Sequence, residues 1–263
     1  MSSEEPLTRR TAPSTGFGPR RAALRETLPR FAMVMAALIA LAAFPQSALF
    51  AIERLDVRGA SMLAPETIAT IAGLREGARL FAVDAEDVLR RLKADPRIKD
   101  AAILIKPPRT IRLDVVERRP LVALAVGDAF ALLGDDLVAV AVGPDSAGLP
   151  EVVDRIRPVP WARAGAPVAS DAARAVLTVL PNIPAAIRVG LRQIIVAPGS
   201  DFTLVLRSGL RIRAGGPAGL AERLAGVPAV LEALRARDIA VAALDLRYAG
   251  SIAVTLSTGG EAP

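Results

Sequence analysis

Two adjacent carboxylates, Asp135 and Asp136, are the residues of the C-terminal half whose types and spacing most suggest chemistry. Paired carboxylates can act as general acid and base in hydrolysis. The doublet follows Gly134 between two apolar runs, however, and Gly-Asp-Asp in that position is typical of a hairpin turn. Because the sequence shows no further polar cluster near the doublet, we favour the turn over a membrane-anchored hydrolase.

The chain has no histidine and no cysteine. These absences exclude a histidine-based triad, a cysteine nucleophile, a His/Cys zinc site and a haem with an axial histidine. They also exclude disulfides, so any exported part must fold on its core alone. Together with the family resemblance described below, these absences lead us to predict that the protein is not an enzyme and has no catalytic residue, no metal site and no cofactor.

A second stretch of interest lies near the C-terminus, where Tyr248 is the only tyrosine of the chain. Alternating residues in 243–248 and 251–257 predict a hairpin that turns at Ala249-Gly250. The last strand is a candidate sheet edge, and from Ser251 to Gly260 it has neither the charges nor the prolines that usually guard an edge.

An unguarded edge with small side chains suits strand addition by a partner, in which backbone hydrogen bonds give affinity. The alternative is that another strand, or the preceding helix, covers this edge. For Tyr248 the alternative is a core ring with its hydroxyl at the rim. The residues alone leave these interpretations equally open.

Overall charge and aromatic content argue against nucleic acid as a partner. The formal net charge is +6, but the basic residues are spread along the chain rather than gathered in runs. Aromatic residues make up 3% of the chain, which is too few for a base-stacking surface.

The first 52 residues predict a tail followed by a membrane anchor. Residues 1–30 are rich in Pro, Ser, Thr and Arg, and we expect them to be disordered. Residues 31–52 contain no charged residue and are long enough, at about 33 Å as a helix, to cross a bilayer. The positive-inside rule places the tail in the cytoplasm and the rest outside it, because the tail holds six arginines, Arg9, Arg10, Arg20, Arg21, Arg25 and Arg30. The alternative, a signal peptide cleaved near Ala51, has too long a leader.

Residues 53–118 predict a small α/β unit in the order strand, helix, helix, strand, strand. The first strand ends at Gly59, and Ser61 is a candidate cap for a helix that runs through Ile71. Asp84 is a candidate cap for the second helix, which Asp95-Pro96 stops. Two strands follow around a Pro-Pro turn in "IKDAAILIKPPRTIRLDVVERRP".

Residues 119–257 predict a strand-rich second domain with a short tail, 258–263, after it. Three short strands are expected in 121–142, a long connection in 143–169 with Trp161 as a satellite core residue, and a helix from Ser170 or Asp171 to about Leu180. Strands at "RQIIVA", "DFTLVLRS" and "LRIRA" precede a helix over 217–237 that Pro228 should kink or split.

The chain resembles the FtsQ/DivIB family of bacterial cell division proteins. The stretches that carry the likeness are "IERLDVRGASMLAPETI", "ADPRIKDAAILIKPPRTIRLDVVERRPLVAL" and the terminal "DLRY". The resemblance implies an α+β protein: a single-pass transmembrane helix, a POTRA domain and a C-terminal mixed or antiparallel β domain with packed helices. Transport accessory proteins and outer-membrane assembly factors also contain POTRA domains, and this is the alternative function.

The resemblance further implies a divisome scaffold in the inner membrane, enriched at the septum, which links the FtsB–FtsL pair to septal peptidoglycan synthesis. Other divisome membrane proteins are expected to bind the POTRA domain, with Arg118, Arg119 and Pro120 at its junction with the β domain. The residues implied in strand addition by FtsB and FtsL are Arg247, Tyr248, Gly250, Ser251, Ala253 and Thr255.

Overall fold

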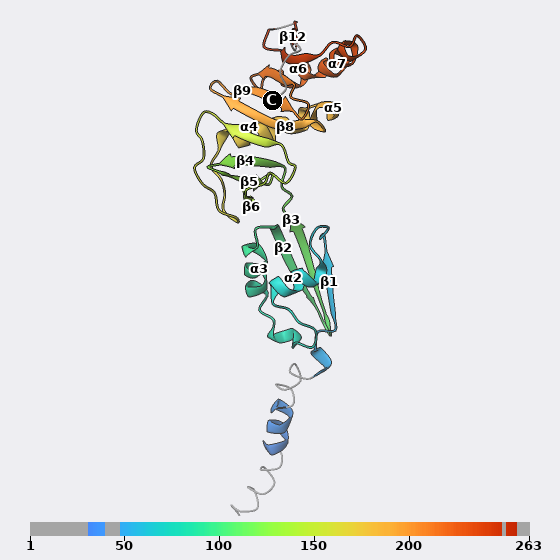
Figure 1. The fold of residues 1–263 in the computed structure, drawn as a ribbon. Coiled ribbons are helices and arrows are strands. Elements are labelled where there is room, and N and C mark those ends of the chain that lie inside the picture. Colours follow the sequence, from blue (N-terminus) through green and yellow to red (C-terminus); the bar gives the residue numbers. More distant parts are fainter. Residues whose placement is uncertain (1–30, 40–47, 249–250, 257–263) are drawn as a thin grey trace, which may run out of the picture.

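The computed structural model describes residues 31–39, 48–248 and 251–256. From residue 51 on, the chain forms two units one after the other (Figure 1). The predicted tails 1–30 and 258–263 lie outside the described residues, as does part of the predicted membrane segment. Residues 31–39 are helical, but no helix within the described ranges is long and apolar enough to cross a membrane.

The N-terminal unit, residues 51–118, has a three-stranded sheet in the order β1-β3-β2, with β1 parallel and β2 antiparallel to β3. Helices α2 and α3 lie side by side on the sheet (Figure 1). Ile68 and Leu92 from the helices and Ile111 from β3 form its core and are fully buried. The elements follow the predicted order: β1 (Arg54–Arg58), α2 (Pro65–Ala72), η3 (Leu80–Ala82), α3 (Ala85–Ala94), β2 (Ile98–Lys106) and β3 (Thr110–Glu117).

The two predicted helix caps of this unit have different outcomes. Asp84 caps α3, because its carboxylate accepts hydrogen bonds from the backbone N–H groups of Glu86 and Asp87. The prediction that Ser61 caps the first helix was wrong. Helix α2 begins four residues later, at Pro65, and its N-cap residue, Ala64, makes no side-chain hydrogen bond to the helix. Proline at the first helical position replaces the missing cap, since its fixed φ suits that position.

The C-terminal unit, residues 121–256, is built on a nine-stranded mixed sheet in the order β12-β11-β10-β9-β8-β7-β4-β5-β6. Its fully buried residues include Leu124, Val152, Ile194 and Phe202. The strands are β4 (Val122–Val126), β5 (Ala129–Leu133), β6 (Ala139–Gly143), β7 (Glu151–Asp154), β8 (Leu191–Ala197), β9 (Asp201–Leu206), β10 (Arg211–Gly215), β11 (Val241–Asp245) and β12 (Ala253–Leu256). The helices are α4 (Asp171–Val179), α5 (Ala185–Arg188), α6 (Leu220–Ala225) and α7 (Val227–Arg235).

Residues 143–169 were predicted as a plain connection, and this was wrong in two respects. They contain β7, which lies inside the sheet between β4 and β8. Trp161 is not a satellite core residue, because 72% of its surface is exposed. The end of β7 is polar and buried: Asp154 accepts hydrogen bonds from the N–H groups of Ile156 and Arg157 and from the Ser170 hydroxyl.

Several other predictions for this unit were confirmed. Ser170 caps α4 through the N–H of Ala173. The predicted helix over 217–237 is split at Gly226 into α6 and α7, and Pro228 lies in the first turn of α7, where it costs no hydrogen bond.

Candidate partner-binding edge and the junction between the units

The last strand, β12, is an edge of the nine-stranded sheet, as predicted. It pairs on one side with β11 and on the other side with no strand of the described residues. All four of its residues are exposed, including Val254 at 37% and Leu256 at 57%. The edge and its aliphatic side chains therefore face solvent.

The hydrogen bonds of β11 determine which backbone groups of β12 point outward. Leu246 donates its N–H to the carbonyl of Arg213 on the β10 side, at 2.8 Å. Since backbone groups of successive strand residues point to opposite sides, Ala243 and Asp245 present theirs to β12.

The register pairs Asp245 with Ala253 and Ala243 with Thr255. Ala253 and Thr255 therefore use their backbone groups within the hairpin, and Val254 presents its N–H and C=O at the free edge. The prediction from sequence emphasised Ser251, Ala253 and Thr255, so it did not identify Val254 as the residue that offers backbone hydrogen bonds.

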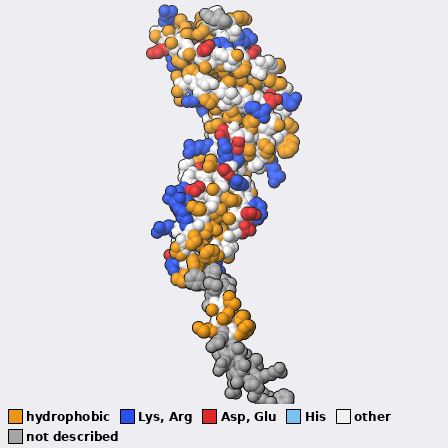
Figure 2. All heavy atoms as spheres, turned by 180° about the vertical axis from the view of Figure 1, so that it is seen from behind, with side chains coloured by type: hydrophobic (Ala, Val, Ile, Leu, Met, Phe, Trp, Pro, Cys, Tyr) orange, Lys and Arg blue, Asp and Glu red, His pale blue; other side chains and the backbone are white. Residues whose placement is uncertain are grey.

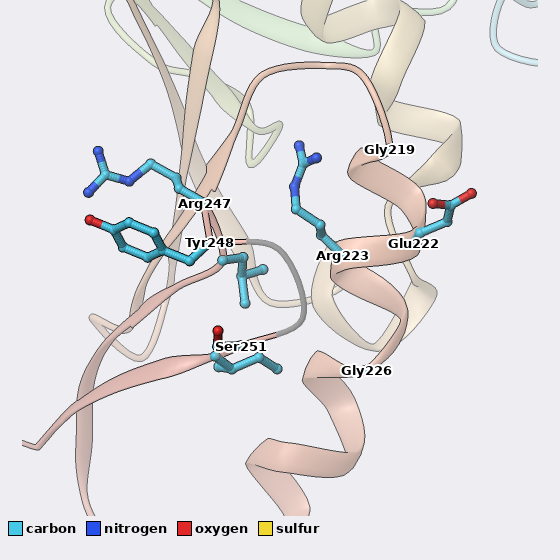
Figure 3. Close-up of a pocket in the computed structure, with 9 residues that line it drawn as sticks. Gly219, Glu222, Arg223, Gly226, Arg247, Tyr248 and Ser251 are labelled. Carbon is cyan, nitrogen blue, oxygen red and sulfur yellow. The ribbon is translucent and has the colours of Figure 1, made fainter.

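Arg247 and Tyr248 follow β11 after one intervening residue, Leu246. The predicted strand over 243–248 ends earlier, at Asp245, and this releases Tyr248 from the alternation that buries Leu244 and Leu246. Tyr248 is 63% exposed, which contradicts the core alternative. Figure 3 shows the side chains of Arg247 and Tyr248 extending side by side, with the guanidinium 6.0 Å from the ring centroid.

Asp245 holds Arg247 in this position. Its carboxylate accepts hydrogen bonds from Arg247 Nε at 3.0 Å and Nη2 at 2.7 Å, and Arg213 lies 3.8 Å away. The hydrogen bond from Arg247, reinforced by both positive charges, lowers the pKa of Asp245 despite its partial burial. Arg247 is therefore a preoriented cation, so its surface is available to a partner at little further entropic cost.

A groove of about 530 Å³ lies between α6 and the hairpin. Its walls include Arg223 from α6 and Leu246, Tyr248 and Ile252 from the hairpin. Arg223 points into the gap between α6 and the strands in Figure 3, and its Nε donates to the carbonyl of Ala214 at 2.8 Å. Tyr248 and Ser251 line this groove, so a segment docked there can also contact the tyrosine ring. Gly250 lies outside the described residues.

Of the predicted junction residues Arg118, Arg119 and Pro120, Arg118 makes side-chain contacts that connect the two units. Arg118 is only 10% exposed in its side chain and pairs with Asp136 at 3.0 Å. It also donates to the carbonyls of Pro96 and Ile98. Lys99 pairs with Asp135 at 2.7 Å, and the hydrogen bond from Lys99 lowers the pKa of that carboxyl. Both carboxylates of the doublet thus bind cations of the N-terminal unit.

The turn between β5 and β6 is shaped for this contact. A side chain at Gly134 would place its Cβ 2.8 Å from Cγ of Arg118, so glycine leaves the space through which the arginine passes. With both carboxylates engaged, the doublet is a structural turn, as favoured from sequence. Within the described ranges, no group of three or more His, Cys, Asp or Glu residues could hold a metal ion.

Glu117 is a structural residue that the sequence reasoning missed. Its carboxylate accepts hydrogen bonds from the backbone N–H groups of Ser61, Met62 and Leu63 at 2.7–2.9 Å. Burial opposes ionisation, but these donors lower the pKa of Glu117. Arg119 donates to the Ser61 hydroxyl at 2.9 Å, so the Glu-Arg-Arg run ties the end of β3 to the loop before α2.

The fold therefore defines a class of protein: a POTRA-type unit followed by a mixed β domain with packed helices. A family model described as "POTRA domain, FtsQ-type" matches residues 50–118. A second, described as "Cell division protein FtsQ/DivIB, C-terminal", matches residues 127–247. The chain belongs to the FtsQ/DivIB family of cell division proteins.

Curated relatives named "Cell division protein FtsQ" agree with this. The protein of Mycolicibacterium smegmatis is 28% identical over 59% of this chain and 44% of its own length, and that of Streptomyces collinus is 30% identical over 62% and 64%. The chain thus spans less than two thirds of these relatives. The Geobacter sp. strain M21 protein is 26% identical over 80% of this chain and 77% of its own length.

Proposed function

We propose that this protein is a non-catalytic scaffold of the divisome, anchored in the inner membrane by residues 31–52 with its N-terminus in the cytoplasm. Its C-terminal edge binds the FtsB–FtsL pair and links it to septal peptidoglycan synthesis, while the N-terminal unit contacts other division proteins. Membership of a cell division family supports the divisome role.

The observation that carries the partner-binding proposal is the open edge of β12. A strand without charge or proline, exposed along its whole length, is an aggregation hazard that proteins normally guard. Its presence beside an exposed aromatic ring and a preoriented arginine is explained if a partner strand covers it. Aromatic and arginine side chains are also the residues that most often dominate binding energy.

Co-purification from membranes tests this proposal. The full chain, expressed with FtsB and FtsL, should capture both partners. Replacing Val254 and Leu256 together by lysine should abolish capture, because lysine on an edge opposes strand pairing. Val189→Lys is the matched control, since Val189 is an exposed valine outside this edge and should retain capture.

Equal capture by the edge variant and the control would refute the role of β12. Circular dichroism must show the same melting temperature for both variants, so that a loss of binding reports on the surface rather than on folding.

A further inference from the structure

An exposed apolar surface lies at the opposite end of the molecule, where the chain enters the N-terminal unit. We call it the base; it is formed by η2 (Ala48–Phe50) and η3 (Leu80–Ala82). The rings of Phe50 and Phe81 meet edge to face at a centroid distance of 5.0 Å. Leu80 is fully buried, but Phe81 is 54% exposed and Leu49 is also exposed. The base therefore presents apolar side chains that the core of the unit does not need.

Hydrogen bonds to the backbone fix the base to the end of the uncharged segment. Ile52 donates to the carbonyl of Ala78 at 2.9 Å and accepts from the N–H of Gly77 at 2.8 Å. Arg109 Nε donates to the carbonyl of Leu49 at 3.1 Å. Because these bonds leave no free linker between residue 49 and the unit, the base must lie wherever residues 31–52 end.

The base is surrounded by exposed basic side chains and by acidic groups that are mostly paired. Arg75, Arg79 and Lys106 are exposed there. Of the acidic groups there, Glu53 pairs with Arg109 and Asp84 caps α3. Asp87 lines the same cavity as Arg79 and Ala82, and it pairs with Arg90 and Arg91. Glu76 is exposed. Figure 2 shows hydrophobic and basic side chains together at the end of the unit that meets the grey segment.

We propose that the base is a membrane-contact surface, which places Phe81 and Leu49 in the interface of a bilayer rich in anionic phospholipid. The proposal rests on the membrane anchor of the proposed function. Amphipathic surfaces bind an interface through buried apolar groups and through attraction of Lys and Arg to anionic headgroups. The contact holds the N-terminal unit upright on the membrane, which a single flexible anchor would not do.

Single-cysteine labelling tests the contact cleanly, because the chain contains no cysteine. Ala82→Cys places a fluorophore beside Phe81 on an exposed position. Met62→Cys is the matched control, exposed on the same unit but at the Glu117 end of β3. The seven residue steps from Thr110 to Glu117 put roughly 23 Å between the two ends.

The labelled full chain is reconstituted into phosphatidylglycerol-containing vesicles with and without doxyl-labelled lipid. We expect quenching at position 82 to exceed quenching at position 62 at least about twofold, because interfacial groups lie within reach of the quencher. Phe81→Ser and Arg79→Ser, each in the Ala82→Cys chain, should reduce this difference, and vesicles of phosphatidylcholine alone should do the same.

Equal quenching at positions 82 and 62, in a chain that floats with the vesicles, would overturn the contact and leave the anchor intact. A chain that fails to float with the vesicles would refute the anchor, and with it this surface.

Discussion

Replacing Val254 by proline is the sharpest test of strand addition, since it alters the free edge without entering the core. Val254 presents its N–H outward, and its side chain is already partly exposed. Docking of a partner strand would convert β12 from an edge strand into an interior strand, where proline is excluded. The substitution should therefore weaken binding and leave the isolated protein almost unchanged.

The expected loss of binding free energy follows from the hydrogen bond that the Val254 N–H would donate to a partner strand. One backbone hydrogen bond contributes about 0.5–1.5 kcal/mol net, and the partner carbonyl left without a donor adds to the loss. A total loss of binding free energy of at least about 1.4 kcal/mol corresponds to a dissociation constant that is tenfold larger. The stability of the free protein should change by no more than about 0.5 kcal/mol, as for other surface substitutions.

The matched variant is Ala253→Pro, one residue away. Its N–H is used within the hairpin, opposite Asp245, so this variant should fray β12 and increase hydrogen exchange there. Titration calorimetry with the purified FtsB–FtsL pair measures both affinities. An unaltered affinity for Val254→Pro, in a protein with a normal melting temperature, would refute pairing along this edge.

Three further predictions concern other parts of the molecule. Tyr248→Ala should weaken partner binding by about 2 kcal/mol without lowering the melting temperature, because the ring is exposed; a lower melting temperature would instead give the ring a structural role. Glu117 has a lowered pKa, so its stabilising effect is complete above the ordinary glutamate pKa of about 4.3 and is lost as the pH falls through the lower folded value. Denaturant unfolding of Glu117→Gln should accordingly depend less on pH in that range than unfolding of the wild type. A reporter active only in the periplasm should be active when fused after Pro263, and an inactive fusion would contradict the proposed orientation.

Local patterns were sufficient to predict most of the N-terminal unit. Its strands alternate, and its second helix has a cap at Asp84 and a stop at Pro96, so each element carries its own signal. The Ser61 prediction failed because a distant group competed for the loop: Glu117, far along the chain, binds the backbone N–H groups that precede α2. No local pattern contains that contact.

The strand β7, inside the sheet, could not be predicted for a different reason. It has four residues, ends in a charged side chain and lies in a segment rich in proline and glycine, all of which favour a loop in a local interpretation. Asp154 is buried only because the Ser170 hydroxyl and two backbone N–H groups satisfy it. Strand pairing with β4 and β8 decides the structure here, and pairing is a property of the whole sheet.

For the candidate site, the alternating pattern and the lack of charges and prolines predicted an edge strand. Which backbone groups of that strand point outward, however, could be inferred only from its register with β11. Leu246 donates toward β10, and this single bond assigns Val254 rather than Ala253 to the free edge. The exposure of Tyr248 could not be predicted either, since the point where β11 stops depends on contacts with the next strand.

The order of strands in the large sheet also determines how far β12 lies from the start of the N-terminal unit. Strands β6, β5 and β4 lie nearest the N-terminal unit and β12 lies farthest from it (Figure 1). Nine strands leave eight spacings of about 4.8 Å, or roughly 38 Å, and the N-terminal unit adds roughly 23 Å. With the proposed anchor in a bilayer, a partner anchored in the same bilayer would have to carry its docking strand roughly 60 Å from the membrane, the length of about 40 residues of continuous helix. Shortening such a helix by two turns should prevent docking even when every residue of the docking strand is intact.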